Sequence, residues 1–122
     1  MRSEELKDRT KKFAINIIKL VESFPKTKVA NVIGAQLIRS ATSIGANYRA
    51  ACRSRSHNDF ISKMAIVEEE ADETLYWLEL LVALKLVSLE NVADLFKEAQ
   101  ELTAIFSASR KTAKAKRNWE IG

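Results

Sequence analysis

Apolar residues recur at helical spacing in four successive segments of the chain. Within each segment they form a seam with gaps of mostly three, four or seven residues, as expected when one face of a helix is buried. The first seam stops at Phe24, because a residue that precedes proline is biased out of the helical region. The seams comprise Leu6, Phe13, Ile17, Leu20 and Phe24, widened by Ile15 and Ile18; Ile33, Leu37, Ala41, Ile44, Tyr48 and Ala51; Phe60, Met64, Val67, Ala71, Leu75, Leu78 and Val82; and Val92, Leu95, Phe96, Ala99, Leu102 and Phe106. Four helices are therefore predicted.

Polar residues between the segments predict where these helices begin. Thr27 precedes the second segment as a candidate N-cap. Ser56 and Asp59 have the spacing of a capping box before the third, and Ser88 is the candidate cap of the fourth. Helices of about 20 to 30 residues joined by short turns are typical of bundles. The pattern predicts an all-α protein, an antiparallel up-down-up-down four-helix bundle.

A single domain accounts for nearly the whole chain of 122 residues. This length suits one domain with one core, which we place at residues 1–113. Residues 114–122 lose the apolar seam and gain charge. We expect them to form a flexible basic C-terminal tail, in which Trp119 could stack on a nucleic-acid base or dock onto the bundle.

Charge is distributed along the chain in blocks of alternating sign. Lys and Arg number 12 against 4 Asp and Glu in residues 1–56, 3 against 11 in residues 57–104, and 5 against 1 in residues 105–122. Such blocks favour mutual neutralisation, within one chain or between subunits. The surplus that remains is basic, with a formal net charge of +4, and favours polyanionic partners.

The arginines of the second helix divide into two groups in this interpretation. If the second and third helices form a hairpin, Arg39 and Arg49 lie near the acidic residues Glu69, Asp72 and Glu73 and are candidates for inter-helix or inter-subunit ion pairs. Arg53 and Arg55 lie near the turn and are better placed for an external anion. The full set of candidate nucleic-acid-binding residues is Lys11, Lys12, Arg53, Arg55, Arg110, Lys111, Lys114, Lys116 and Arg117.

The third segment is apolar on more than one face after Thr74. Tyr76, Trp77, Leu80 and Leu84 lie off its main seam, and large apolar patches are seldom left in water. One interpretation is a central helix that touches both of its neighbours. The other, which we favour, is an oligomer interface formed by these four residues.

Catalytic and metal-binding patterns are missing from the sequence. Carboxylates gather around Glu69, but di-iron bundles use Glu-x-x-His motifs on two helices, and the one histidine, His57, has no glutamate three residues before it. Cys52 has no histidine at hydrogen-bonding spacing, and the three glycines are too isolated for a phosphate loop. We expect no cofactor, no metal and no enzymatic activity. Ser43 and Asn47, one turn apart, are interpreted as structural polar residues.

A single cysteine, no apolar N-terminal leader and no long uncharged apolar run predict a cytoplasmic protein that does not enter the membrane.

The run from Gln36 to Leu81 resembles the 23S rRNA-intervening sequence protein family, also called four helix bundle proteins. The resemblance also includes the late segment KTAKAKRN. It is carried by a Ser-Ile-x-x-Asn segment, a basic turn, an aromatic residue that leads the third helix, and acidic residues before an aliphatic end. These are Ser43, Ile44, Asn47, Arg53, Arg55, Phe60, Glu69, Asp72, Glu73 and Leu78.

The resemblance implies a compact antiparallel four-helix bundle of the kind often encoded within bacterial large-subunit rRNA genes. A related branch, the accessory protein of diversity-generating retroelements, is a basic homopentamer that associates with nucleic acid and a reverse transcriptase. By that analogy we expect a homo-oligomer, with a pentamer favoured, and a reverse transcriptase as a possible partner.

Two hypotheses about function follow. The first is a non-enzymatic homo-oligomeric bundle that binds RNA or DNA through its basic surface residues, with steep salt dependence. The second is a protein-interaction scaffold or adaptor that binds no nucleic acid, in which basic residues neutralise the acidic helices of neighbours.

Overall fold

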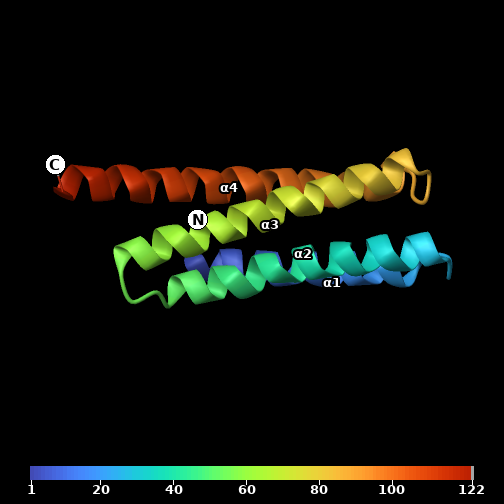
Figure 1. The fold of residues 1–122 in the computed structure, drawn as a ribbon, viewed down its shortest axis with the longest axis horizontal. Helices are drawn as coiled ribbons and strands as arrows, with labels where there is room; N and C mark the ends of the chain where they lie inside the picture. Colours follow the sequence, from blue (N-terminus) through green and yellow to red (C-terminus); the bar gives the residue numbers. More distant parts are fainter. Residues whose placement is uncertain (122) are drawn as a thin grey trace.

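The computed structural model describes the backbone of residues 1–121 and the side chains of residues 1–118. The chain forms four helices, α1 (Ser3–Glu22), α2 (Lys28–Cys52), α3 (His57–Ala83) and α4 (Leu89–Ile121). Successive helices run in opposite directions (Figure 1). The predicted all-α, up-down-up-down bundle is confirmed.

Side-chain caps begin the last three helices at the residues that the sequence indicates. The hydroxyl of Thr27 accepts a hydrogen bond from the Ala30 N–H at 3.2 Å. The Ser56 hydroxyl accepts one from the Asp59 N–H at 3.0 Å, and the Ser88 hydroxyl one from Asn91 at 3.2 Å. Each cap satisfies a backbone donor that the first helical turn leaves without a partner.

The core follows the four predicted seams, with corrections on two helices. Ile15 and Ile18, expected to widen the buried stripe of α1, are 42% and 36% exposed. They lie on the side of α1 that turns away from the other helices. On α3, the residues Ile61, Thr74 and Leu81 are buried although the seam omitted them, because α3 contacts both α2 and α4 and buries a wider face.

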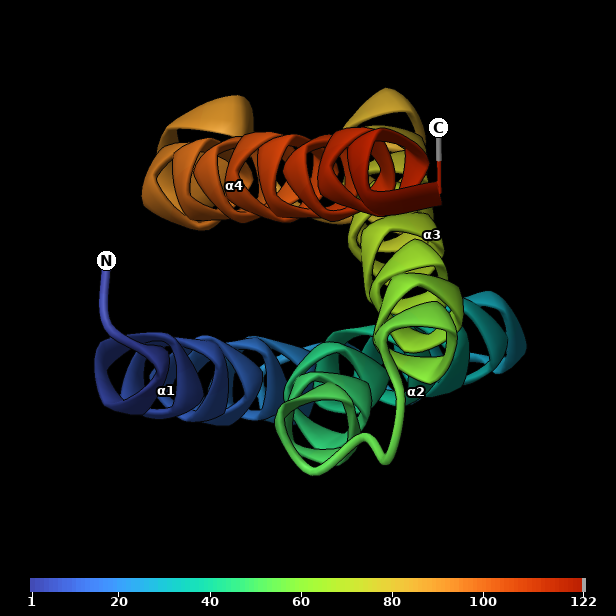
Figure 2. The same ribbon diagram turned by 90° about the vertical axis from the view of Figure 1, so that its left-hand side faces the viewer.

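The helices are not packed equally on all sides. α2 packs closely on α3, α3 on α4 and α1 on α2, whereas α1 and α4 contact each other little. In the view along the helices, α1 and α2 lie side by side, and α3 rises from the α2 side of that layer towards α4 (Figure 2). Arg9 links α1 to α4. Its Nε and Nη2 atoms donate hydrogen bonds to the Glu98 carboxylate at 2.7 and 2.6 Å.

The last part of the chain differs from the separate tail that we expected. α4 continues without a break to Ile121, so residues 114–121 extend the helix. The flexibility of this segment stays a prediction. Residue 122 and the side chain of Trp119 lie outside the described part of the chain. Within that part, none of the helices is both long enough and apolar enough to cross a membrane.

Candidate functional site at the basic end of the bundle

One end of the bundle brings together two basic segments that are far apart in sequence. The α2–α3 turn carries Arg53 and Arg55. The last turns of α4 contact the start of α3, directly after this turn, at the end of the molecule where α4 terminates in Figure 1. His57 Nε2 lies 2.7 Å from the Ala113 carbonyl oxygen, and Arg117 Nη1 donates to Asn58 Oδ1 at 3.2 Å. These two contacts fix α4 against the start of α3.

Most of the cations at this end face solvent. Five of them, all exposed, make up what we call the basic end: Arg53, Arg55, Lys111, Lys114 and Lys116. Among the side chains that the structure describes, none of these five forms an ion pair. Their charges are available to an anion from outside the chain.

Arg110 has a different position from the other basic residues of α4. Its Nε donates to Glu68 Oε2 on α3, and both side chains are largely shielded from solvent. The hydrogen bond from Arg110 holds the pKa of the Glu68 carboxyl below its usual value. Arg110, a candidate for nucleic-acid binding, therefore links α3 to α4.

The two lysine candidates of α1 lie about two turns or more from the basic end. Lys11 is exposed at the edge of a groove between α1 and α2. Lys12 lines a surface cavity between α1 and α4 together with Arg9 and Glu98. Neither belongs to the basic end.

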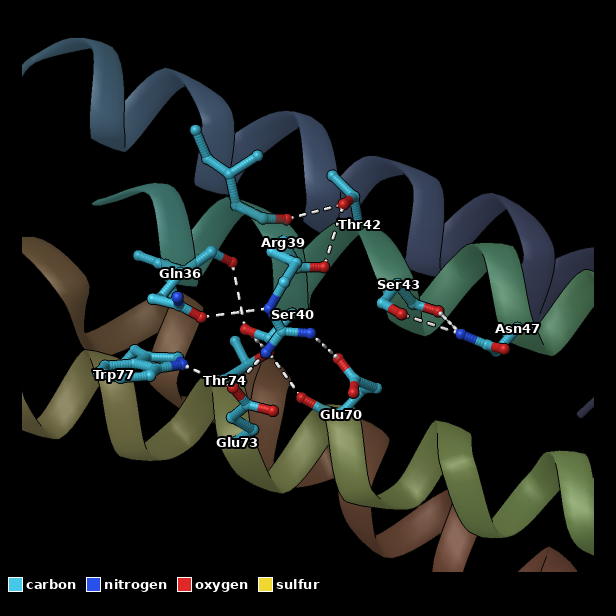
Figure 3. A network of polar contacts seen from close by, with 12 residues as sticks. Gln36, Arg39, Ser40, Thr42, Ser43, Asn47, Glu70, Glu73, Thr74 and Trp77 are labelled. Atoms are coloured by element: carbon cyan, nitrogen blue, oxygen red, sulfur yellow. Dashed lines mark hydrogen bonds and ion pairs between the residues drawn. The ribbon is translucent and has the colours of Figure 1, made fainter. Parts of the chain in front are cut away.

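A polar network between α2 and α3 contains Glu73, one of the three acidic residues that the sequence singled out (Figure 3). Arg39 Nη1 donates to Glu70 Oε2 at 3.1 Å, and Nη2 donates to Glu73 Oε1. Trp77 Nε1 donates to the same Glu73 oxygen at 3.1 Å. The hydrogen bond from Arg39, helped by that from Trp77, lowers the pKa of Glu73. Glu70 is a partner that sequence reasoning missed.

The remaining ion-pair candidates are not brought together. Arg49 faces α1 rather than α3, at the α1–α2 groove. Glu69 and Asp72 are exposed beside Arg110 at the surface between α3 and α4. Within the described part of the chain, neither these two carboxylates nor Arg49 forms an ion pair.

The structural polar residues Ser43 and Asn47 bond to each other within one helix. Asn47 Nδ2 donates to the carbonyl oxygen and the hydroxyl of Ser43, both at 2.9 Å, so this pair bonds within α2 (Figure 3). The buried polar contact between helices joins the hydroxyls of Ser40 and Thr74, 2.9 Å apart. Both residues are fully buried. In a segment rich in serine and threonine, the sequence alone did not distinguish this pair.

The candidate oligomer interface on α3 is partly open to solvent. Tyr76 and Leu84 are 54% and 48% exposed, and Trp77 and Leu80 are half-buried. The rings of Tyr76 and Trp77 meet edge to face, with their centroids 5.1 Å apart. These exposures leave an apolar surface available to a partner.

The described residues hold no group of three or more side chains suited to a metal ion. Cys52 is exposed and unbonded to another cysteine. Burial, followed by a hydrogen bond with Cys52, raises the pKa of Tyr48. These side chains form no arrangement with a nucleophile, base and orienting group.

Fold and surface together define a small antiparallel four-helix bundle with one basic end. Residues 3–108 match the 23S rRNA-intervening sequence protein family, and the chain belongs to that family. The chain is also similar to the crystal structure of a protein with unknown function from the S23 ribosomal protein family of Bacteroides thetaiotaomicron. The two are 34% identical with a TM-score of 0.84, over 91% of this chain and 99% of that chain. No curated protein matches the chain.

The family match confirms the resemblance seen in the sequence but is shorter than we expected. It ends at residue 108, before the segment KTAKAKRN. The α4 half of the basic end therefore lies beyond the matched region.

Proposed function

We propose that this protein is a non-enzymatic, homo-oligomeric bundle that binds RNA or DNA through its basic end. The observation that carries the proposal is the contact of the last turns of α4 with the start of α3, directly after the α2–α3 turn. It places five exposed cations together without ion pairs among the described side chains.

The arrangement suits contacts with backbone phosphates. Exposed Lys and Arg side chains that bind phosphates release condensed counterions, so affinity falls steeply as salt rises. The cavities between α1 and α2, between α3 and α4 and between α1 and α4 are lined by none of the five residues of the basic end. Binding of this kind is tolerant of sequence.

The test replaces Lys111, Lys114 and Lys116 by glutamate and follows binding of a short fluorescent single-stranded RNA by anisotropy. A matched control replaces Lys19, Lys26 and Lys28, which are exposed at the opposite end of the bundle. At low salt we expect the first variant to lose at least about tenfold in affinity. Its slope of log affinity against log salt should be shallower by about 2, because each phosphate contact on a single strand contributes about 0.7.

Two results would overturn the proposal. One is wild-type affinity in the first variant. The other is an equal loss in the control, which would indicate that total charge matters and the basic end does not. A duplex DNA of the same length, measured in parallel, distinguishes a preference for single strands.

A second candidate function is a protein-interaction scaffold without nucleic acid. It is favoured by the ion pairs of Arg9, Arg39 and Arg110, in which three arginines neutralise acidic residues of the same chain. For this candidate we expect high salt to dissociate the oligomer. Nucleic-acid binding predicts instead that salt releases the RNA while the oligomer persists. The family resemblance favours five subunits and, as a protein partner, a reverse transcriptase.

A further inference from the structure

The surface cavity between α1 and α4 lies where the bundle is packed least closely. These two helices contact each other less than the other packed pairs of helices do. The cavity has a volume of about 330 Å³, and Phe13 and Leu95 supply its apolar lining. The other lining residues are polar or charged: Arg9, Lys12, Asn16, Asp94 and Glu98. We call this depression the α1–α4 cavity.

The ion pair of Arg9 with Glu98 fixes the level of α1 against α4. The guanidinium donates to the Glu98 carboxylate at 2.7 and 2.6 Å, and about three-quarters of each side chain is shielded from solvent. The two helices run in opposite directions (Figure 1). Three or four residues further along α1 are therefore level with three or four residues earlier on α4. This register places Lys12 at the level of Asp94.

Lys12 and Asp94 carry opposite charges at this level but do not pair. Both side chains are exposed, and among the described residues neither forms an ion pair. The pair of Arg9 with Glu98 shows that opposite charges can meet across the boundary between the helices. One turn away, opposite charges line the same cavity without meeting.

Asn16 adds an amide to the α1 side of the cavity. It lies four residues after Lys12, so the two side chains are neighbours on one face of the helix. Asn16 is half-buried, and its amide forms no hydrogen bond with the described residues. Asparagine is unfavourable in a helix interior. Here it has both donors and its acceptor free for a ligand.

The charges around the cavity determine which ligand fits. Asp94 and Glu98 repel an anion that has no positive group, and Lys12 and Arg9 repel a cation that has no negative group. A molecule with both charges meets Lys12 at one end and Asp94 at the other. The cavity volume of about 330 Å³ is near the lower limit of ligand sites in proteins, about 300–1,000 Å³, and suits a small molecule.

We propose that the α1–α4 cavity binds a zwitterionic α-amino acid with an apolar side chain. The carboxylate contacts the Lys12 ammonium and accepts a hydrogen bond from the Asn16 amide, while the ammonium group contacts the Asp94 carboxylate. The side chain packs against Leu95 and Phe13. The bound amino acid thus links the two helices that are packed least closely. The inference goes beyond the proposed function, because the cavity shares no residue with the basic end.

The first test compares leucine with two analogues that each lack one charge. N-acetylleucine has no ammonium group, leucinamide has no carboxylate, and all three have the same side chain. Titration of the deuterated protein is followed by heteronuclear NMR through the Asn16 side-chain amide. We expect leucine to bind with a dissociation constant of about 1 mM, as a few solvent-exposed contacts allow, and each analogue to bind at least about tenfold more weakly.

The second test changes one charge of the protein at a time. Lys12→Gln and Asp94→Asn should each weaken leucine binding about fivefold, as expected for loss of one exposed ion pair. Lys12→Gln should not weaken leucinamide further, and Asp94→Asn should not weaken N-acetylleucine further. The matched controls Lys19→Gln and Glu90→Gln remove exposed charges of the same two helices outside the cavity, and leucine affinity should stay unchanged.

Leucine should also slow amide hydrogen exchange in α1. A ligand at ten times its dissociation constant, bound only while α1 and α4 are together, slows exchange through detachment of α1 by about tenfold. Exchange in α1 that leucine leaves unchanged would contradict the bridging position. Equal affinity for the three ligands, or unchanged leucine affinity in both cavity variants, would overturn the proposal.

The absence of leucine-dependent shifts at about 10 mM, ten times the expected dissociation constant, would overturn it as well. The variant with Lys111, Lys114 and Lys116 replaced by glutamate separates this site from the proposed function. It keeps every residue of the α1–α4 cavity, so we expect it to bind leucine as the wild type does while it loses RNA. Loss of leucine binding in this variant would contradict a site independent of the basic end.

Discussion

Two basic residues that are neighbours in the sequence have different roles in the structure. Arg110 and Lys111 are neighbours in one basic run, yet Arg110 turns towards α3 and pairs with Glu68 while Lys111 stays exposed. The side of the helix on which each side chain lies decides this. A change at Arg110 therefore affects folding, whereas a change at Lys111 affects the surface.

The pair of Arg110 with Glu68 predicts a pH-dependent stability. The folded pKa of Glu68 lies below its usual value of 4.5, because Arg110 donates a hydrogen bond to it. Its contribution is therefore complete above pH 4.5 and is lost as pH falls from there through the folded pKa. We expect Arg110→Gln to lower the free energy of unfolding by about 1 kcal/mol at pH 7 and by less at pH 3.5.

Urea denaturation between pH 3.5 and 8 measures this difference. Lys111→Gln is the matched control, since it removes one neighbouring charge without breaking an ion pair. A loss in Arg110→Gln that stayed constant down to pH 3.5 would contradict the assignment to Glu68.

At the scale of the helices, α1 depends on close packing against α2. Gly34 faces the last turns of α1, where a Cβ would lie 2.8 Å from Val21 Cγ1 and 3.5 Å from the ring of Phe24. Val21 is β-branched and cannot rotate away easily. The absence of a side chain at residue 34 therefore sets the distance between these two helices.

Gly34→Ala should therefore destabilise the protein despite the better helix propensity of alanine. Overpacking typically costs about 1–3 kcal/mol, against a gain of about 1 kcal/mol for replacing glycine in a helix. We expect a net loss of about 1 kcal/mol and faster amide hydrogen exchange in α1. In a double-mutant cycle, Val21→Ala should relieve the loss. Additive effects of the two changes would indicate that their side chains do not meet.

The local features of these helices were predictable from sequence, and the features that depend on a neighbour were not. Caps and seams follow from residues within one turn, and the three side-chain caps are where we expected them. Ile15 and Ile18 are exposed because the width of a buried stripe depends on which sides other helices occupy. The contact of Ser40 with Thr74 depends on the register of two helices, and the sequence leaves that register open.

The dependence on neighbouring helices also decides which residues of the candidate site could be predicted. Arg39 lies against α3, as the hairpin predicts, but Arg49 lies ten residues further on and is rotated by roughly 80° around the helix. It therefore faces α1. The contact of Arg117 with Asn58 could not be predicted, because it depends on α4 continuing past residue 113, where we expected a flexible tail.

At the scale of the molecule, charge is not spread evenly over the bundle. Carboxylates of α3 and α4 are matched by Arg9, Arg39 and Arg110 along the length of the helices. The basic end has no comparable set of partners among the described side chains. Like charges held near one another repel, and this repulsion opposes folding until an anion binds.

The basic end should therefore lower stability at low salt. Lys114 and Lys116 lie more than a turn before the end of α4, where the helix dipole favours cations only weakly. We expect Lys114→Gln with Lys116→Gln to raise the free energy of unfolding by up to about 0.5 kcal/mol at low salt, the usual range of surface changes. The gain should disappear near 0.5 M salt, where screening acts within roughly 4–5 Å.

Lys97→Gln provides a control with the opposite sign. Lys97 is exposed on α4 at helical spacing from Asp94 and Glu101, so its loss should lower stability at low salt. Thermal unfolding at low and high salt compares the two variants. If the change at the basic end also lowers stability, its lysines are neutralised within the protein and do not await a ligand. If it raises stability while weakening RNA binding, the lysines are retained at a cost to folding, as expected for residues that serve a binding function.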